Sequence, residues 1–595
     1  MKVRAKKRDK NIAVAAMALG AFAACQTAPA HADDMSVEIH MLKERLKQLE
    51  ERVAEQGRKE KQTQEKLRQQ AAQQPAPPPG PAPYVFPAGI GVPPQPGPGG
   101  LTGTETAVRG LPTLGPSTIW FKGVTITPGG FLALESVTRS AFLGADIGSP
   151  GFSNIPFENA PSSHSGEFRF SARQSRFSLL TQGDVDPVTH LAGYGEVDFL
   201  GAAQTANSNE SNSFNLRARH LYLTVDNDFF GAHLLAGQTW SLATMNTKGI
   251  VPRQEDIPLT IDSQYVPGFV WQRTPQIRLV KDIAENAWFA LSAESPATTF
   301  GTAPGAGTFF DGATIVDTVA AAGTAFPQTT VLGGSLFNSA NAISLTQMPD
   351  IIGKVAWEPT ILDRTIHMEA FGIFRQFTDR VIYPVATAAA APYPAFPFGT
   401  GLQNHNNTST GEGVGGSILI PIVPKVFDVQ FSGLTGRGIG RYGSGQLPDV
   451  TFNTDGSLAP IQETMLLVGG VWHAFPELDI YGYAGEEFQG SHYSFAINNA
   501  HTVTPIGWGN PLYVNTGCNV EFFGTGAGTT ACIGNTSLVR QATVGFWDNI
   551  YKGPFGRLTG GLQYSFTQKY AFAGIGGSPE RNENTFLTSL RYYPF

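Results

Sequence analysis

The connections between short alternating segments constrain this chain more than any other feature. From about residue 120 onward, segments of about ten residues alternate apolar and polar side chains, which is the pattern of a β-strand with one apolar face. Every second segment is followed by a short turn, and the others by loops of about 10 to 50 residues. A soluble sandwich has no reason to place its short connections at one end, whereas an outer-membrane barrel has short periplasmic turns and long external loops. The sequence therefore predicts an all-β fold, a transmembrane antiparallel β-barrel over residues 117–595.

About sixteen segments fit the pattern, an even number, as is usual for such barrels. The predicted strands are 129–139, 167–182, 189–201, 214–226, 232–241, 269–281, 287–295, 350–358, 365–377, 411–422, 426–437, 463–474, 478–487, 536–551, 556–567 and 585–595. The short turns are 184–187, 227–231, 359–363, 423–425 and 475–477. Aromatic residues near strand ends are expected to form girdles at the membrane interfaces: Tyr222, Trp271, Trp288, Trp357, Trp472, Trp547, Tyr551, Tyr564, Tyr592 and Tyr593.

The composition excludes the main alternatives to a β-barrel. Charged residues make up only 15% of the chain and glycines number 68, which argues against a helical bundle. No stretch after residue 35 has the roughly 18 uninterrupted apolar residues of a membrane helix. With 41% hydrophobic residues the chain is also too apolar to be disordered throughout.

Residues 1–32 are predicted to be a secretory signal peptide. A basic start is followed by an apolar run over 12–24 and by the small residues Ala30 and Ala32 at a cleavage site. An alternative is a lipoprotein signal, in which Cys25 would be acylated. Cleavage after residue 32 would remove six basic residues and one acidic residue from the 41 and 48 of the whole chain, leaving 35 and 47 and a net charge of −12. This acidic balance argues against a nucleic-acid partner.

Residues 33–74 are predicted to form a short periplasmic coiled coil. Its core positions recur at alternating spacings of four and three: Met35, Ile39, Leu42, Leu46, Leu49 and Val53. A solitary amphipathic helix is the alternative, but so short a helix is marginal alone in water, and the pattern does not decide between two and three strands. Residues 75–116 are rich in Pro and Gly, which predicts an extended, semi-rigid linker.

Two cysteines remain after the signal peptide, Cys518 and Cys532, in a segment rich in Gly, Asn and Thr. Because the chain enters an oxidising compartment, a disulfide within this loop is expected. Two buried free thiols are the alternative. No metal site and no cofactor are expected.

Several arginines alternate with apolar residues in the predicted strands. A guanidinium facing lipid at the midplane costs roughly 2 to 4 kcal/mol, so these side chains should face the interior or a polar subunit contact. The expected pore-lining residues are Arg169, Arg173, Arg176, Arg217, Arg219, Arg273 and Arg278. Alternation cannot put Arg173 and Arg176 on one face, so a bulge, a rim position or an interface must separate them. Such a ladder would attract anions; the alternative is a salt-bridge network with Glu167, Glu196 and Asp198.

The loop over residues 242–268 carries charges of both signs and is the predicted constriction loop. Its charged residues are Lys248, Arg253, Glu255, Asp256 and Asp262. Opposite a cationic wall, such a loop would create a transverse field that orients anionic solutes. The alternative is a lid on the surface.

Four blocks of sequence resemble the DcaP-like trimeric outer-membrane porins. The blocks lie at 166–177, 195–199, 216–222 and 235–241, and the order of coiled coil and sixteen-stranded barrel is also similar. This resemblance implies a homotrimer with a periplasmic stalk and a preference for small anionic solutes such as dicarboxylates.

Taken together, these features predict a porin in the outer membrane of a Gram-negative bacterium. A barrel of about sixteen strands is wide enough for an aqueous channel. The expected partners are the lipid bilayer, lipopolysaccharide, two further copies of the chain and small anionic solutes. An envelope tether that binds peptidoglycan or a periplasmic partner through the stalk is the alternative. An enzyme is not expected: His367 and Glu369 share a strand face without a second cluster, and the glycines of 438–443 fit G-x-G-x-x-G only by chance.

Overall fold

The computed structural model describes Lys47 and residues 119–148, 152–201, 215–301, 314–316, 328–331, 346–382, 405–453, 457–497, 503–521 and 532–595. The chain divides into two units, Met1–Pro93 and Pro94–Phe595, and all the described residues except Lys47 belong to the second. The predicted signal peptide, Cys25, the coiled-coil core and the linker lie outside the described residues. In the described part of the chain, no helix is long and apolar enough to cross a bilayer.

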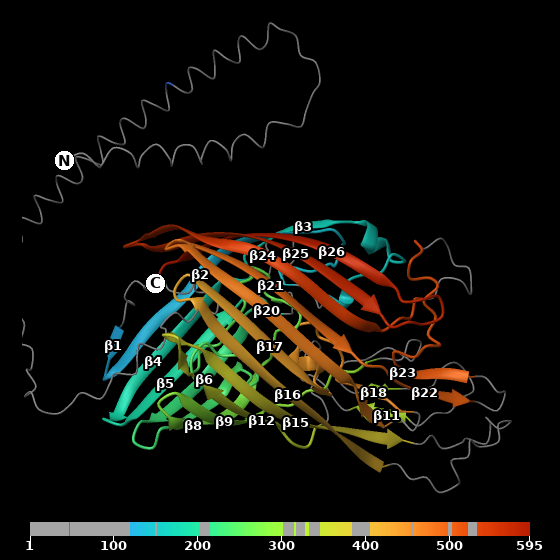
Figure 1. The fold of residues 1–595 in the computed structure, drawn as a ribbon, viewed down its shortest axis with the longest axis horizontal. Helices are drawn as coiled ribbons and strands as arrows, with labels where there is room; N and C mark the ends of the chain where they lie inside the picture. The colour runs from blue at the N-terminus through green and yellow to red at the C-terminus, as the bar shows by residue number, and fades with distance from the viewer. Residues whose placement is uncertain are drawn as a thin grey trace, which may run out of the picture. The chain divides into compact units, whose positions relative to one another are not determined.

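Sixteen antiparallel strands close into a barrel, as predicted (Figure 1). In chain order they are β2 (Val124–Arg139), β3 with β4 (Glu167–Ser171 and Arg176–Asp186), β5 (Thr189–Asp198), β6 (Arg217–Asn227), β7 (Ala232–Trp240), β8 (Arg273–Ala284), β9 (Ala287–Glu294), β12 (Asp350–Trp357), β15 (His367–Ile382), β16 (His405–Val423), β17 (Phe427–Arg437), β20 (Gln462–Phe475), β21 (Leu478–Gln489), β24 (Thr536–Gly553), β25 (Gly556–Ala571) and β26 (Glu580–Tyr593). The barrel closes where β2 pairs with β26, with Leu132 opposite Tyr592.

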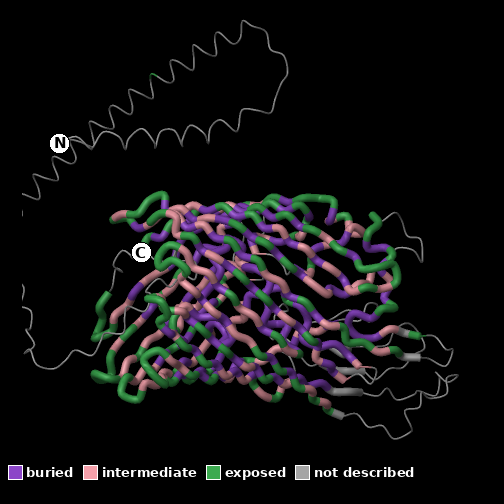
Figure 2. Tube along the Cα trace, in the orientation of Figure 1, coloured by how far each residue is buried: buried purple, intermediate pink, exposed green. Residues whose placement is uncertain are grey.

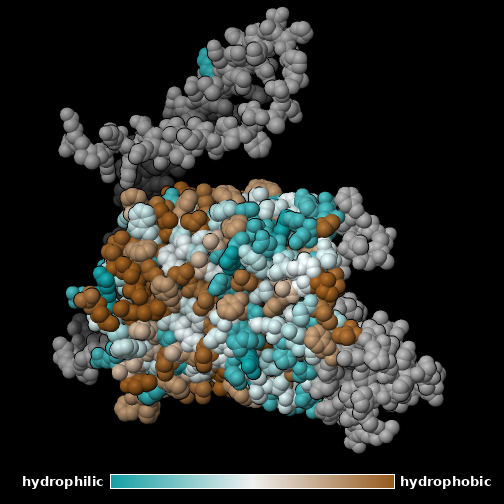
Figure 3. All heavy atoms as spheres, turned by 45° about the vertical axis from the view of Figure 1, so that its right-hand side comes forward, coloured by the Kyte–Doolittle hydropathy of each residue, from teal (hydrophilic) through white to brown (hydrophobic). Residues whose placement is uncertain are grey.

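Buried and exposed residues alternate along the strands of this wall (Figure 2). In β8, Ile277 is 60% exposed and faces outward, whereas its neighbour Arg278 is 2% exposed and faces inward. The outer surface carries many apolar side chains (Figure 3). A barrel in lipid requires an apolar outer face, because this face contacts the lipid tails. Closure of the barrel meets a second requirement, since it leaves no unpaired strand edge in the lipid.

The predicted aromatic girdles are only partly confirmed. Exposed aromatic side chains lie near the short-turn ends of the strands at Trp357, Trp472, Tyr551 and Tyr592. The prediction was wrong for Tyr222, Trp547 and Tyr593, which are buried. Their positions alternate with outward residues, so their rings pack inside the barrel.

Two irregularities place arginines on the inner face. The second predicted strand breaks between Ser171 and Arg176, where the chain leaves the sheet and returns. This break resolves the conflict over Arg173 and Arg176, which do not share one regular strand. In β6 the register shifts between Glu196, which lies opposite His220, and Val197, which lies opposite Ala218. Arg219 is the extra residue of this β-bulge, which turns both Arg219 and His220 inward.

The loops and turns between the barrel strands contain short strands that were not predicted from the sequence. Two hairpins, β18–β19 (Val450–Phe452 and Leu458–Pro460) and β22–β23 (His492–Ile497 and Val503–Trp508), lie at the long-loop end. The short strands β10 (Thr314–Val316) and β11 (Gln328–Val331) extend the sheet beside β15, and β13–β14 (Thr360–Ile361 and Arg364–Thr365) form a short turn. At the N-terminal edge, β1 (Ile119–Phe121) pairs with β2.

Candidate functional site: the interior loop and the arginine-rich wall

The loop that joins β7 to β8 lies inside the barrel and contacts the opposite wall. The Leu259 backbone N–H donates to the Tyr483 hydroxyl at 3.1 Å, and the Trp547 Nε1 donates to the Leu259 carbonyl at 2.7 Å. The Ile261 N–H donates to Gln563 Oε1 at 2.5 Å. These partners belong to β21, β24 and β25, across the barrel from β7 and β8. The loop therefore spans the interior, and we call it the interior loop (residues 241–272).

An apolar cluster holds the middle of the interior loop against the wall. From the loop it contains Ile257, Leu259, Ile261, Tyr265, Val266 and Phe269, and from the strands Trp240, Tyr481, Tyr483 and Trp547 among others. All these side chains are buried. Burying a large apolar side chain contributes about 1.5–3 kcal/mol, so the cluster fixes the course of the loop.

The first turn of the interior loop is held by a cluster of ionisable groups on β12, on β15 and at Glu358, which directly follows β12. Lys354 Nζ donates to the Thr244 carbonyl at 2.7 Å and to Glu369 Oε2 at 2.9 Å. The Asn246 N–H donates to Glu369 Oε1 at 3.1 Å, and the Gly249 N–H donates to Glu358 Oε1 at 2.5 Å. His367 and Glu369, noted in the sequence for sharing a face, belong to this anchor: their side chains are 3.0 Å apart.

The five predicted charged residues of the constriction loop have different environments. Lys248 is exposed, and Arg253 and Glu255 are half-buried. The Arg253 guanidinium lies 5.2 Å from the ring centre of Tyr194 on the facing wall. Asp256 and Asp262 are buried, so only Lys248, Arg253 and Glu255 of the five are accessible to water. Asp262 instead orders the loop itself, since its Oδ1 accepts from the Gln264 N–H at 2.8 Å.

The wall that faces the interior loop contains a cluster of four arginines and two carboxylates, which we call the arginine cluster: Arg176, Arg217, Arg219, Arg273, Glu196 and Asp198. Arg217 binds Asp198 with two hydrogen bonds, of 3.0 and 2.6 Å. Arg219 bridges both acids, with Nε 2.7 Å from Glu196 and Nη1 3.0 Å from Asp198. The remaining two guanidinium groups complete the cluster: Arg176 is 3.7 Å from Glu196, and Arg273 lies 4.4 Å from the ring centre of Trp240.

Within the arginine cluster, cations outnumber carboxylates. The alternative interpretation of the sequence, a salt-bridge network with Glu196 and Asp198, thus accounts for part of the arginine set. The Arg219 side chain is 1% exposed, but that of Arg217 is 34% exposed. An excess of arginines over carboxylates in a partly closed, low-dielectric space attracts anions.

The other three predicted arginines do not belong to this cluster. Arg169 faces the interior, 3.4 Å from Glu167. Among the predicted arginines that form ion pairs, it has the most exposed side chain. Arg173 holds the break in the second strand, binding Asp146 at 3.0 Å and the Phe199 carbonyl at 2.9 Å. Arg278 is buried and donates to the Trp240 carbonyl at 2.6 Å. Arg176, Arg219 and Arg278 are therefore buried among partners on the inner side of the wall.

Sequence reasoning missed further inward ion pairs elsewhere on the wall. Arg591 binds Glu135 at 2.7 Å, Arg139 binds Glu167 at 2.8 Å, and Arg375 binds both Asp350 and Asp449 at 3.0 and 2.7 Å. The signal was available, because Arg591 lies between Leu590 and Tyr592 and Glu135 follows Leu134. The same alternation argument that selected Arg217 and Arg219 selects these residues too.

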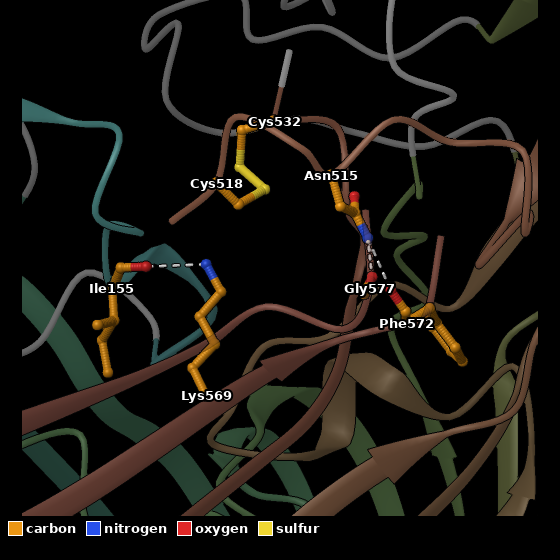
Figure 4. The surroundings of a disulfide bond; sticks show 7 residues. All are labelled: Ile155, Asn515, Cys518, Cys532, Lys569, Phe572 and Gly577. Atoms are coloured by element: carbon orange, nitrogen blue, oxygen red, sulfur yellow. Dashed lines mark hydrogen bonds between the residues drawn. A yellow bond between two sulfur atoms is a disulfide. The ribbon is translucent and has the colours of Figure 1, made fainter. Parts of the chain in front are cut away.

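The predicted disulfide between Cys518 and Cys532 is confirmed. Cys518 packs with Phe157 and Ala571 in a small apolar cluster. Two neighbouring contacts fix this region, as Figure 4 shows: Asn515 Nδ2 donates to the carbonyls of Phe572 and Gly577, at 3.0 and 2.9 Å, and Lys569 Nζ donates to the Ile155 carbonyl at 2.8 Å. The disulfide therefore closes a loop whose base is seated on β25 and its neighbours.

Replacing both cysteines by Ser is expected to loosen this loop and to leave the barrel intact. A cross-link between residues 14 apart lowers the conformational entropy of the unfolded chain, which stabilises the folded state by about 3 kcal/mol. Limited proteolysis should then cut between residues 518 and 532 much faster than in the unchanged protein, while the temperature at which the barrel loses its heat-modifiable mobility on gels stays the same. Equal cleavage rates with and without the cysteines would contradict the expectation.

A closed sixteen-stranded barrel with a long loop folded inside defines the class: the fold is that of outer-membrane channel proteins. No protein-family model matches the chain, and no curated protein matches it. Among solved structures, the outer membrane channel DcaP of Acinetobacter baumannii matches with a TM-score of 0.50 and 16% identity, over 80% of this chain and 99% of that one. The resemblance inferred from residues 166–241 is confirmed at the level of the fold.

Two further solved structures are similar over nearly as much of the chain. The anion-selective porin from Comamonas acidovorans has a TM-score of 0.38 and 10% identity, over 79% of this chain and 99% of that one. OprB of Pseudomonas putida has a TM-score of 0.39 and 9% identity, over 78% of this chain and 94% of that one.

Proposed function

We propose that this protein is an outer-membrane porin that lets small hydrophilic anions, such as dicarboxylates, diffuse through a water-filled channel. The observation that carries the proposal is a closed barrel, apolar outside, in which an interior loop faces a wall with more arginines than carboxylates. In this proposal the solute passes between the interior loop and the arginine cluster. Arg217, Arg253 and Arg273, which are only partly buried, contact the solute, and the buried Arg219 positions Glu196 and Asp198.

In this proposal three chains assemble in the outer membrane, each with an N-terminal stalk in the periplasm. The short turns lie in the periplasm and the long loops outside, as in other barrels of this class. Residues 33–74 form a periplasmic coiled-coil stalk and residues 75–116 link it to the barrel, with three chains per assembly. These parts rest on the sequence pattern and on the resemblance to trimeric porins, and lipid and lipopolysaccharide surround the barrel.

Planar-bilayer recording of the purified full chain tests the channel function. We expect conductance in steps of three and a reversal potential that shows preference for chloride over potassium in a salt gradient. Arg217→Gln combined with Arg253→Gln should lower the chloride-to-potassium permeability ratio about two- to threefold, because two partly exposed cations leave the path.

Arg540→Gln is the matched control for these two substitutions. Arg540 is exposed and alternates with the buried Val539 and Gln541, so it lies on the outer face of β24. The same loss of positive charge there should leave the permeability ratio unchanged. Folded protein without any conductance would contradict the porin proposal and favour the tether interpretation.

A further inference from the structure

A second group of charged residues lies on the inner face at the short-turn end of the barrel, far along the strands from the arginine cluster. It consists of two histidines and four aspartates, which we call the mouth cluster: Asp184, His190, Asp226, Asp228, His233 and Asp282. All but Asp228 lie within one or two residues of the short-turn end of a strand: Asp184 in β4, His190 in β5, Asp226 in β6, His233 in β7 and Asp282 in β8. Asp228 lies in the turn between β6 and β7. The strand register places them side by side, with Asp184 opposite His190, His190 opposite Asp226, and Asp226 opposite His233.

Each histidine is held between two carboxylates, one at each ring nitrogen. For His190, Nδ1 is 2.6 Å from Asp184 Oδ1 and Nε2 is 3.3 Å from Asp228 Oδ2. For His233, Nδ1 is 2.8 Å from Asp226 Oδ1 and Nε2 is 3.2 Å from Asp282 Oδ2. The same arrangement therefore occurs twice, at His190 of β5 and at His233 of β7, the two strands that flank β6.

This geometry selects the doubly protonated form of both rings. A neutral imidazole has one N–H and one lone pair, so one of its two carboxylates would face a lone pair. An imidazolium donates from both nitrogens and satisfies both acids, and charge-assisted hydrogen bonds of this kind are the stronger ones. With four carboxylates and two imidazolium ions, the mouth cluster carries a net charge of −2.

The mouth cluster is in contact with water. Side-chain exposures are 30% for His190 and 32% for His233, and range from 33% to 75% for the four aspartates. His190 and His233 alternate with Leu191 and Leu234, which are exposed on the outer face. The nearby Lys281 is an outer-face residue by the same alternation, and its ammonium group donates to the Phe230 carbonyl. The water that reaches the cluster is therefore inside the mouth of the barrel.

We propose that these six residues form a charge filter at the short-turn mouth, in which His190 and His233 are doubly protonated and the aspartates leave an excess of negative charge. The inference rests on the proposed channel function and adds a second selectivity element with the opposite sign to the arginine cluster. Cations accumulate at this mouth, and anions are preferred deeper in the channel. Because the two elements lie at different depths, current through the channel depends on the direction of the applied voltage.

The experiment compares substitutions that change the charge of the mouth in opposite directions. His190→Gln with His233→Gln changes the net charge of the cluster from −2 to −4, and we expect the potassium-to-chloride permeability ratio to rise about threefold in planar bilayers. Asp184→Asn with Asp282→Asn changes it from −2 to 0 and should lower the ratio by a similar factor. Shifts of the same sign for both pairs, or no shift for the histidine pair, would overturn the proposal.

A third cluster of the same type supplies a control. His473 lies between Asp428 and Asp479, but the three side chains are only 13%, 16% and 4% exposed. His473→Gln should therefore leave the permeability ratio unchanged, and a shift as large as that of the histidine pair would show that exposure of the cluster to water is not what matters.

Protonation can be measured without any current. In full-length protein labelled with ¹⁵N-histidine, both ring nitrogens of His190 and His233 should give the signals of protonated nitrogen at pH 7.5, assigned by their loss in the Gln variants. Signals of a neutral ring in a conducting protein would overturn the filter alone. Doubly protonated rings in a protein that does not conduct would overturn the channel function, and the filter with it.

Discussion

Replacing residues 246–266 by a flexible Gly/Ser linker is expected to raise the single-channel conductance severalfold. These residues include most of the side chains that the interior loop contributes to the apolar cluster, which holds it against β21, β24 and β25. With the loop gone, the cross-section available to ions is set by the wall of the barrel, which for sixteen strands encloses a wide aqueous channel. The measurement is the step size in planar bilayers, after heat-modifiable migration on gels has shown that the variant is folded. A step size equal to that of the unchanged protein would mean that the loop does not restrict the path.

A smaller change separates loosening of the interior loop from loss of the fold. Gln563 Oε1 accepts from the Ile261 N–H at 2.5 Å and from the Tyr481 hydroxyl at 3.1 Å, so Gln563→Ala removes one attachment of the loop and leaves the others. We expect frequent brief increases in current rather than a larger steady step. Gln568→Ala is the matched control on the same strand, because Gln568 lies on the outer face and contacts Arg540 and Asn582.

The second large effect is expected at the seam where the first and last strands of the barrel meet. Arg591 of β26 donates to Glu135 of β2 at 2.7 and 3.0 Å, and both side chains are fully buried. Arg591→Met leaves the Glu135 carboxylate buried without its cation, which costs about 3–5 kcal/mol. The unfolding midpoint in urea should fall accordingly, measured by heat-modifiable migration and tryptophan fluorescence.

The double substitution Glu135→Met with Arg591→Met tests the cause of that loss. Replacing both members of a buried pair by apolar residues is often neutral or stabilising, so most of the lost stability should return. Arg557→Met is a suitable comparison, since Arg557 lies at the short-turn end of β25 over the Tyr593 ring and is in no ion pair among the described residues. A double variant as unstable as the single one would show that packing, rather than charge, explains the effect.

Much of the fold could be predicted because the strands of a barrel in lipid alternate apolar and polar residues along the sequence. The alternation around Ile277 and Arg278, or around Leu216 and Arg217, shows which side chains face lipid and which face the interior. This assignment does not require knowing which strands are paired. Strand bounds were therefore predicted to within a few residues for most strands. The sequence showed the break at 172–175 only as a conflict between the spacing of Arg173 and Arg176. The contact made at the break, from the inward Gln174 side chain to the Ile261 carbonyl, involves the distant interior loop and leaves no local signal.

The pairing of interior charges could be predicted only in part. Glu196 and Asp198 were identified as partners because they lie on a strand next to the arginines they bind. Glu135 and Arg591 are 456 residues apart, and only closure of the barrel brings them together. Similarly, nothing local in the sequence shows that Asp262 is buried, because its environment is made by strands from the other end of the chain.

The interior loop also sets the order in which the protein must be put together. Its contacts join residues 224, 288 and 302 positions apart, so the loop leaves the ribosome long before the strands on which it is seated. Such distant contacts are slow to form, because a long stretch of chain must be ordered before they are made. Tyr265, Phe269 and the other buried side chains of the loop stay exposed until β24 and β25 arrive. Until then the unfinished chain presents an apolar surface, and the wall of the barrel closes in the same step in which its interior is filled.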